Sequence, residues 1–238
     1  MAILEVCAAH IASVAAAVVG GADRIELCAG LGLGGLTPGP GLMEAAVELS
    51  DIPVRVLIRP REGDFCYNAA ERRQMLADIR HCKKAGAEGV VIGALRAEGR
   101  VDKDTLSALI EEARPLALTF HRAIDVCADP GEALEWLIEA GVDTVLSSGG
   151  AIDVWAGRHA LRAMLAQAAG RIAVMPGGGL RLNHAAELHT LLQAPAYHVS
   201  ASVPAPSPAA YPHPLPGLSP DWSRSDQALV AAFREALA

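Results

Sequence analysis

The chain has 238 residues, a formal net charge of −7 and an apolar fraction of 52%. The acidic balance, without a basic stripe, argues against nucleic acid as a partner. No uncharged run of 18 apolar residues occurs, so we expect no membrane span. Glu5 interrupts the apolar start, so we expect no secretory leader. Five widely spaced cysteines without a CxxC motif predict a reducing cytoplasm and no disulfide framework.

Short apolar runs alternate with helical patterns from residue 1 to about residue 200. The runs are nearly continuous, as expected for parallel strands covered by helices. Predicted strands are 2–7, 23–28, 53–59, 89–93, 116–121, 143–147, 172–175 and 197–200. Predicted helices are 11–20, 41–50, 70–85, 103–114, 130–140, 152–169 and 182–193. Strand starts recur about every 28 residues, the length of one βα unit. The sequence therefore predicts an α/β fold, a (β/α)8 barrel of TIM type over 1–238, with an open doubly wound sheet as the alternative.

The last part of the chain has a different character. Residues 203–220 are rich in proline, and we expect an extended, unpacked segment that forms a long eighth loop. Residues 223–237 carry an apolar stripe with helical spacing. We expect this helix to close the barrel by packing on the first and seventh helices.

Two predicted strands each carry a carboxylate and, two residues later, a thiol: Glu5 with Cys7, and Glu26 with Cys28. Residues i and i+2 of a strand share a face, so neighbouring strands would bring these four groups together. A buried cysteine is commonly a small apolar residue, whereas a buried glutamate needs a partner or a function. The alternative to a function is a buried ion-pair network, for example between Glu26 and Arg59.

Other polar residues also fall at predicted strand ends, where barrel enzymes carry their working groups. His121 and His198 can titrate near neutral pH with small shifts. Arg59 and Arg61 could clamp an anion. One of the two glutamates would then act as general base, with His121 as acid or orienting group.

A glycine run follows the seventh predicted strand at Gly177, Gly178 and Gly179. Barrels commonly hold a phosphate there, on backbone N–H groups and a helix N-terminus. Ser148, after the sixth strand, could add a donor. The alternative is a simple tight turn.

Several of these motifs closely resemble the CutC family, which is named for copper homeostasis. The resemblance rests on Leu4-Glu5-Val6-Cys7 and on residues 20–28, 34–38, 58–65, 119–123 and 174–179. It spans residues 3 to about 201 and implies a cytoplasmic (β/α)8 barrel associated with copper tolerance. It also implies copper ligands at Cys7 and Cys28. Family members usually carry an arginine where this chain has Ser202.

The sequence is therefore compatible with two functions. The resemblance implies Cu(I) binding or trafficking through Cys7 and Cys28, and soft thiolates do select Cu(I). Nearby carboxylates would raise the pKa of these thiols, and the arginines and His121 would have no role. An enzyme acting on a small anionic metabolite, phosphorylated metabolites included, uses more of the residues but specifies no reaction. Because barrels often dimerise, a homodimer is a further expectation.

Overall fold

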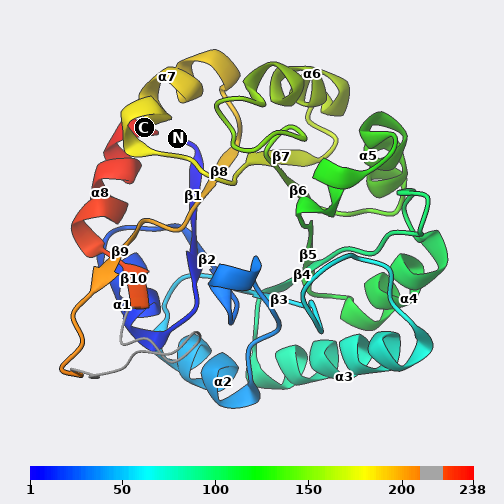
Figure 1. Ribbon diagram of the computed structural model, residues 1–238, viewed down its shortest axis with the longest axis horizontal. Helices are drawn as coiled ribbons and strands as arrows, with labels where there is room; N and C mark the ends of the chain where they lie inside the picture. The colour runs from blue at the N-terminus through cyan, green and yellow to red at the C-terminus, as the bar shows by residue number, and fades with distance from the viewer. Residues whose placement is uncertain (210–221) are drawn as a thin grey trace.

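The computed structural model describes residues 1–209 and 222–238. Eight parallel strands form its sheet, in the order β7-β6-β5-β4-β3-β2-β1-β8. The strands are β1 (Ile3–Ala8), β2 (Arg24–Leu27), β3 (Val54–Leu57), β4 (Gly89–Ile92), β5 (Ala117–Phe120), β6 (Thr144–Ser147), β7 (Ala173–Pro176) and β8 (Ala196–Val199). A parallel bridge between Gly177 and His198 joins the two ends of the sheet. Figure 1 looks down the resulting ring, which the helices surround. The predicted (β/α)8 barrel is confirmed.

Within the described residues, eight helices surround the strands, and several of them begin or end at local sequence signals. They are α1 (Ile11–Val19), α2 (Pro40–Leu49), α3 (Ala69–Ala85), α4 (Lys103–Ala113), α5 (Pro130–Glu139), α6 (Arg158–Ala168), α7 (Leu182–Leu192) and α8 (Gln227–Ala236), with short 3-10 helices η1 (Leu31–Leu33) and η2 (Arg122–Val126). The Asn68 side chain caps α3 in a capping box with Glu71. The same helix ends at Gly86, with φ at +84°. No helix in the part of the chain that the structure describes is long and apolar enough to cross a membrane.

The sixth helix is shorter than predicted and begins at Arg158 instead of residue 152. The Asp153 side chain accepts a hydrogen bond from the Ala156 N–H, and the Val154 N–H donates to the Gly178 carbonyl. These bonds hold residues 151–157 as a turn against the loop after β7. The apolar pattern alone did not indicate this turn.

The Pro-rich stretch begins with a strand that the sequence did not predict. β9 (Ser202–Ala205) pairs antiparallel with β10 (Trp222–Ser225). The expectation of an unpacked segment is wrong for the residues of β9, and the rest of that expectation over residues 210–221 lies outside the described ranges. The last helix accordingly begins at Gln227 instead of residue 223, with Asp226 capping it through the Leu229 N–H.

The last helix packs between α1 and α7, as predicted (Figure 1). Val230 and Phe233 form its buried face. A Cβ atom on Gly20 would lie 2.6 Å from the Val230 Cβ, so α8 crosses the end of α1 at a distance that only glycine allows.

The inside of the barrel is charged at its N-terminal end. Buried Arg55 donates to the Glu88 carboxylate at 3.0 Å and to the Thr119 and Thr144 hydroxyls at 2.8 and 3.2 Å. Apolar residues fill the layer between strands and helices. The polar groups therefore lie inside the ring, and the largest apolar core lies outside it.

Candidate functional site

A cavity of about 490 Å³ opens at the C-terminal ends of the strands. One part of its wall is polar and contains Cys7, Glu26, Arg59, His121 and His198. Another part is apolar and contains Leu31, Leu33, Leu57, Phe65, Leu146 and Leu180. This is the end of the barrel at which enzymes of this fold carry their working residues.

The register of β1 against its two neighbours builds the polar wall. Glu5 lies opposite His198 on β8 and opposite Arg24 on β2. Cys7 lies opposite Glu26 on β2. Three strands therefore bring the predicted carboxylates, one predicted thiol and one predicted histidine into contact.

Glu5 is completely buried and is held as an anion. Its Oε1 accepts a hydrogen bond from His198 Nδ1 at 2.8 Å, and its Oε2 accepts one from Arg24 Nε. Burial alone would raise its pKa, but the hydrogen bond from His198 and the charge of Arg24 lower the pKa to about 2. Arg24 was not predicted as a site residue. A charged residue inside an apolar strand, two positions before Glu26, was the available signal.

His198 lies between the two glutamates. Its Nε2 is 3.8 Å from Glu26 Oε2, on the far side of the ring from the bond to Glu5. Burial lowers the pKa of His198, but the charge of Glu26 and the hydrogen bond with Glu5 outweigh it and leave the pKa raised. Both glutamates therefore favour the protonated form of the imidazole.

The pKa of Glu26 is shifted in the opposite direction to the pKa of Glu5. Burial raises its pKa, and the charge of Glu5 raises it further, against the lowering effects of His198, Cys7 and Arg24. Two carboxylates whose pKa values are driven apart in one site are typical of acid–base machinery. The two carboxyls of this wall therefore differ, with the pKa of Glu5 lowered and the pKa of Glu26 raised.

Cys7 is a thiol in these surroundings. Its Sγ donates to Glu26 Oε2 at 3.3 Å and lies 3.6 Å from Cys28 Sγ. The hydrogen bond with Cys28, burial and the charge of Glu26 raise the pKa of Cys7 well above its usual range. Cys28 is fully buried against Leu57 and Val91 and does not line the cavity. Neither position favours a nucleophilic thiolate.

The same wall offers ligands for a metal ion. Donor atoms of Cys7, Glu26 and His198 all lie within 4.8 Å of one another, in a search limited to residues 1–209 and 222–238. The Cys28 sulfur adds a second soft donor next to Cys7. A thiolate pair suits Cu(I), whereas the carboxylate and imidazole suit harder ions.

The two predicted anion-binding arginines are engaged elsewhere. The Arg59 Nη atoms donate to backbone carbonyls of the loops after β2 and β3, so Arg59 braces these loops. The acceptors are Leu33, Gly35 and Gly63. Arg61 binds Asp64 at 2.9 Å and Glu71 at 2.6 Å and does not line the cavity. The Glu26–Arg59 pair considered as the alternative does not form, and the buried ion pair is Glu5–Arg24.

The three glycines after β7 have two different roles. Gly177 closes the barrel, and a Cβ atom there would lie 2.7 Å from the His198 Cβ. Gly178 and Gly179 line the cavity with φ at +100° and +71°. The Arg122 guanidinium lies against Gly178, 3.0 Å from where a Cβ atom would be. Arg122, next to His121 in the sequence, is a cavity-lining cation that the sequence analysis did not single out.

Ser148 is fully buried and holds other residues in place instead of lining the cavity. Its hydroxyl accepts a hydrogen bond from the Arg122 guanidinium at 2.9 Å and donates one to the Asp125 carboxylate at 2.9 Å. Asp125 also accepts from the Ser147 hydroxyl and the Gly150 N–H. This network fixes Arg122 beside the cavity.

His121 lines the cavity but is not suited to act as an acid. Burial and the charge of Arg59 lower the pKa of His121 to about 3. Its Nδ1 accepts a hydrogen bond from the Ala123 N–H at 3.1 Å, so the neutral ring carries its hydrogen on Nε2.

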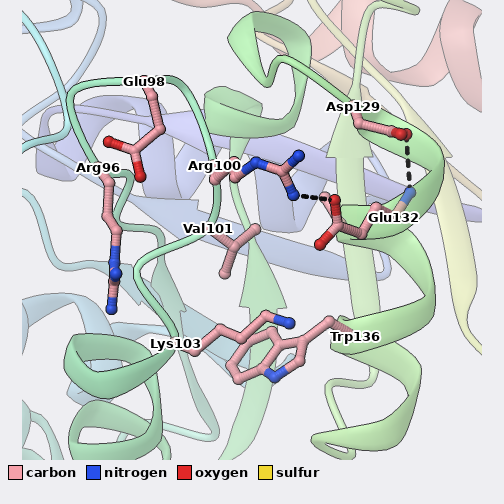
Figure 2. A pocket seen from close by; sticks show the side chains of 9 residues that line it. Arg96, Glu98, Arg100, Val101, Lys103, Asp129, Glu132 and Trp136 are labelled. Atoms are coloured by element: carbon pink, nitrogen blue, oxygen red, sulfur yellow. Dashed lines mark hydrogen bonds and ion pairs between the residues drawn. The ribbon is translucent and has the colours of Figure 1, made fainter.

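A second hollow of about 220 Å³ lies outside the barrel, between the loop after β4 and the start of α5 (Figure 2). Figure 2 shows Arg100 directed at Glu132 and Asp129 capping the backbone of Glu132. Side chains of Arg100 and Glu132 are 59% and 45% exposed, so solvent screens their charges. This hollow lacks the buried titratable groups of the barrel cavity.

Comparison with known proteins shows to which family the chain belongs. The chain matches the CutC family over residues 2–203. It belongs to the CutC family. A CutC family protein of Xanthomonas axonopodis pv. citri (strain 306) is 44% identical over 235 residues, which are 98% of each chain. One of Xylella fastidiosa (strain 9a5c) is 45% identical over 94% of this chain and 84% of the relative.

Solved structures agree with this family. A CutC protein of Streptococcus agalactiae, described there as a copper homeostasis protein, has a TM-score of 0.80 at 28% identity, covering 84% of this chain and 99% of that one. Thiamine phosphate pyrophosphorylase of Pyrococcus furiosus has a TM-score of 0.60 at 16% identity, covering 99% of this chain and 95% of that one. The second likeness shows the barrel fold alone.

Proposed function

We propose that this CutC-family chain is an enzyme that acts on a small anionic metabolite by acid–base chemistry. The observation that carries the proposal is the pair of glutamates on either side of His198. The pKa of Glu5 is lowered to about 2 and the pKa of Glu26 is raised, in one wall of one cavity. Such opposed shifts assign one carboxylate to orientation and the other to proton transfer.

Each group has a defined part in this chemistry. Glu5, fixed by Arg24, orients His198 and stabilises its imidazolium. The charge of His198, whose Nε2 is 3.8 Å from Glu26 Oε2, favours the ionised form of Glu26, and the ionised Glu26 accepts the proton of the substrate. The Cys7 thiol donates a hydrogen bond to the Glu26 carboxylate. Isomerases, lyases and hydrolases all use such a set, so the fold does not name the reaction.

The anionic part of the metabolite would lie at Gly178 and Gly179, beside Arg122. These glycines line the same cavity as Glu26, and their positive φ angles keep the backbone open to a close approach. Asp125 pairs with Arg122 at 2.8 Å, so a single anionic group is favoured over a doubly charged one.

The test is a metabolite screen that reads proton transfer directly. Small carboxylates and phosphorylated metabolites are incubated in D2O with the wild type, and proton NMR follows loss of their C–H signals. We expect one class to exchange with the wild type but not with Glu26→Gln, while Glu135→Gln on the surface leaves the rate unchanged. Exchange that persists in Glu26→Gln would contradict the proposed role of Glu26, and its absence throughout the panel would contradict proton-transfer chemistry.

Cu(I) binding through Cys7 and Cys28 is the second candidate, and the 3.6 Å separation of their sulfurs favours it. The Streptococcus agalactiae relative is described as a copper homeostasis protein, and for this reason we propose copper as the ion that this chain would bind. Binding must release the proton of Cys7, whose pKa is raised, so affinity should increase with pH.

A competition titration against a Cu(I) chelator tests this candidate. If Cys7 and Cys28 bind Cu(I) directly, we expect tight one-to-one binding that disappears in the Cys7→Ser/Cys28→Ser double variant. The Cys66→Ser/Cys127→Ser double variant is the matched control, because both of those cysteines are half-buried and free. Equal affinity in wild type and in both double variants would rule out the two-thiol site.

We also propose the cytoplasm as the location. The five cysteines are free in the structure, which suits a reducing compartment. Fractionation of cells that produce a tagged chain would test it. The homodimer stays a prediction, to be measured by light scattering.

A further inference from the structure

His121 lines the cavity and has a buried ring nitrogen without a partner in the described residues. The residue is 5% exposed. Its Nδ1 accepts the Ala123 N–H, which leaves Nε2 as the hydrogen-bearing nitrogen. Nε2 is buried and makes no hydrogen bond within residues 1–209 and 222–238. Buried donors are rarely left unpaired, so a ligand atom is the expected partner.

Two neighbours fix the position of this ring. A Cβ atom on Gly93 would lie 2.3 Å from His121 Cε1 and 2.8 Å from Nε2, so only glycine leaves room for the imidazole. The Phe65 ring lies with its centroid 4.8 Å from that of His121 and also lines the cavity. The orientation of the N–H group is therefore set before any ligand enters, as donors to a developing charge require.

Surrounding charge keeps this ring neutral. Arg59, held by three backbone carbonyls, lies over the Phe65 ring with its Cζ 5.2 Å from the ring centroid. Burial and this positive charge lower the pKa of His121 to about 3. A neutral imidazole N–H donates a hydrogen bond without losing its proton, and the nearby positive charge favours a negatively charged acceptor.

We propose that the Nε2–H group of His121 donates a hydrogen bond to the carbonyl oxygen of the substrate, which makes the substrate a small anionic carbonyl compound. This inference rests on the proposed acid–base function and names its substrate class. His121 follows β5 and Glu26 lies on β2, three positions away around the ring (Figure 1), and both line the cavity between them.

The reaction then balances without a further reactant. Ionised Glu26 takes a proton from the carbon next to the carbonyl group. The C–H electron pair forms a C=C bond, and the π pair of the carbonyl moves to the oxygen, where His121 stabilises the enolate. The Glu26 carboxyl exchanges its proton with solvent and then returns a proton to carbon, so in D2O the carbon gains deuterium. The hydrocarbon part of the substrate lies against Leu33, Phe65 and Leu180.

The test uses 2-oxobutanoate, with 2-hydroxybutanoate and butanoate as matched probes. In D2O the wild type should exchange the C3 hydrogens of 2-oxobutanoate alone. His121→Phe, which keeps the packing on Phe65 but has no donor, should exchange at least about 100-fold more slowly. Gly93→Ala, which displaces the ring, should show a similar loss, and His121→Gln, which keeps a donor, should lose less. Circular dichroism and melting temperature verify that each variant is folded.

A second readout does not depend on turnover. In protein labelled with ¹⁵N-histidine, His121 should remain the neutral Nε2–H tautomer from pH 5 to 8, and the Nε2 signal should shift when 2-oxobutanoate is added. Titration of His121 within that range, or wild-type exchange by His121→Phe, would overturn the inference and leave the proposed function standing. No exchange of 2-oxobutanoate by the wild type would overturn the carbonyl substrate class, while the wider metabolite screen decides the proposed function separately.

Discussion

At the scale of single residues, Glu5 shows what one buried charge does to its neighbours. It binds Arg24 and His198 and is completely buried. Removing one partner of a buried ion pair leaves the other charge without compensation. Glu5 is thus a structural anion that also raises the pKa of His198, together with the charge of Glu26.

We expect Glu5→Gln to lower the free energy of unfolding at pH 7 by about 3–5 kcal/mol. The pKa of Glu5 falls from 4.5 to about 2 on folding, so its contribution is complete above about pH 4.5 and is lost as the pH falls toward 2. Urea unfolding at pH 7 and at pH 3 should therefore show a smaller difference between variant and wild type at the lower pH.

Glu135→Gln is the matched control. Glu135 also has a pKa lowered to about 2, through hydrogen bonds from Arg171 and Gln167, but it lies on the surface. Solvent screens its ion pair, so the effect of this variant on stability should be much smaller. Equal losses for the two variants would contradict the role assigned to burial.

Sequence reasoning found Glu5, Glu26 and Cys7 because spacing within a strand fixes which residues share a face. It could not find Arg24 as the partner of Glu5, since a shift of one residue in the strand register would place another residue opposite. The neutral state of His121 could not be predicted from the sequence either, because it depends on burial and on the position of Arg59.

At the scale of elements, the join between β7 and β8 depends on one glycine. The Gly177–His198 bridge brings the two end strands together, and a Cβ atom on Gly177 would lie 2.4 Å from Leu146 Cδ1. The glycine run is therefore partly a packing device, in addition to lining the cavity.

Gly177→Ala should destabilise the protein by about 1–3 kcal/mol, because the added methyl group overpacks the join. Urea unfolding gives the value. Gly41→Ala is the control: within residues 1–209 and 222–238, no atom outside its own helical turn lies within 4 Å of its Cβ position in α2, so helix propensity should stabilise that variant by about 0.5–1 kcal/mol. A stable Gly177→Ala protein would mean that β7 and β8 can move apart freely.

Most elements could be predicted because each carries its own local signals. Asp129 with Pro130 marks the start of α5, and Gly86 marks the end of α3. The β9–β10 pairing could not be predicted, since residues 206–221 separate its two strands in the sequence. The start of α6 depends in the same way on a contact with the distant loop after β7.

At the scale of the whole molecule, α8 completes the outer ring of helices. It packs on α1 and α7 beside β1, and Arg234 binds Asp23 at 2.6 Å and the Ala2 carbonyl at 3.0 Å. The last helix thus holds the first strand, although it lies beyond the residues matched to the family.

Phe233→Ala should lower the free energy of unfolding by about 3–5 kcal/mol, because Phe233 is 2% exposed at this junction. Thermal unfolding by circular dichroism measures it. Leu49→Ala is the comparison, since Leu49 is 47% exposed and should change stability by less than about 1 kcal/mol. Similar melting temperatures for both variants would show that α8 is dispensable to the barrel.

The contact between Glu5 and His198 has a consequence for synthesis on the ribosome. The two residues are 193 positions apart, so at about 5–20 residues per second β1 waits about 10–40 s for β8 to be made. During that interval the edge of β1 that pairs with β8 is open and Glu5 lacks one of its partners. The nascent chain is then exposed to aggregation, which makes it a candidate client for ribosome-associated chaperones. The polar wall of the cavity is completed only when β8, the last strand of the barrel, has emerged.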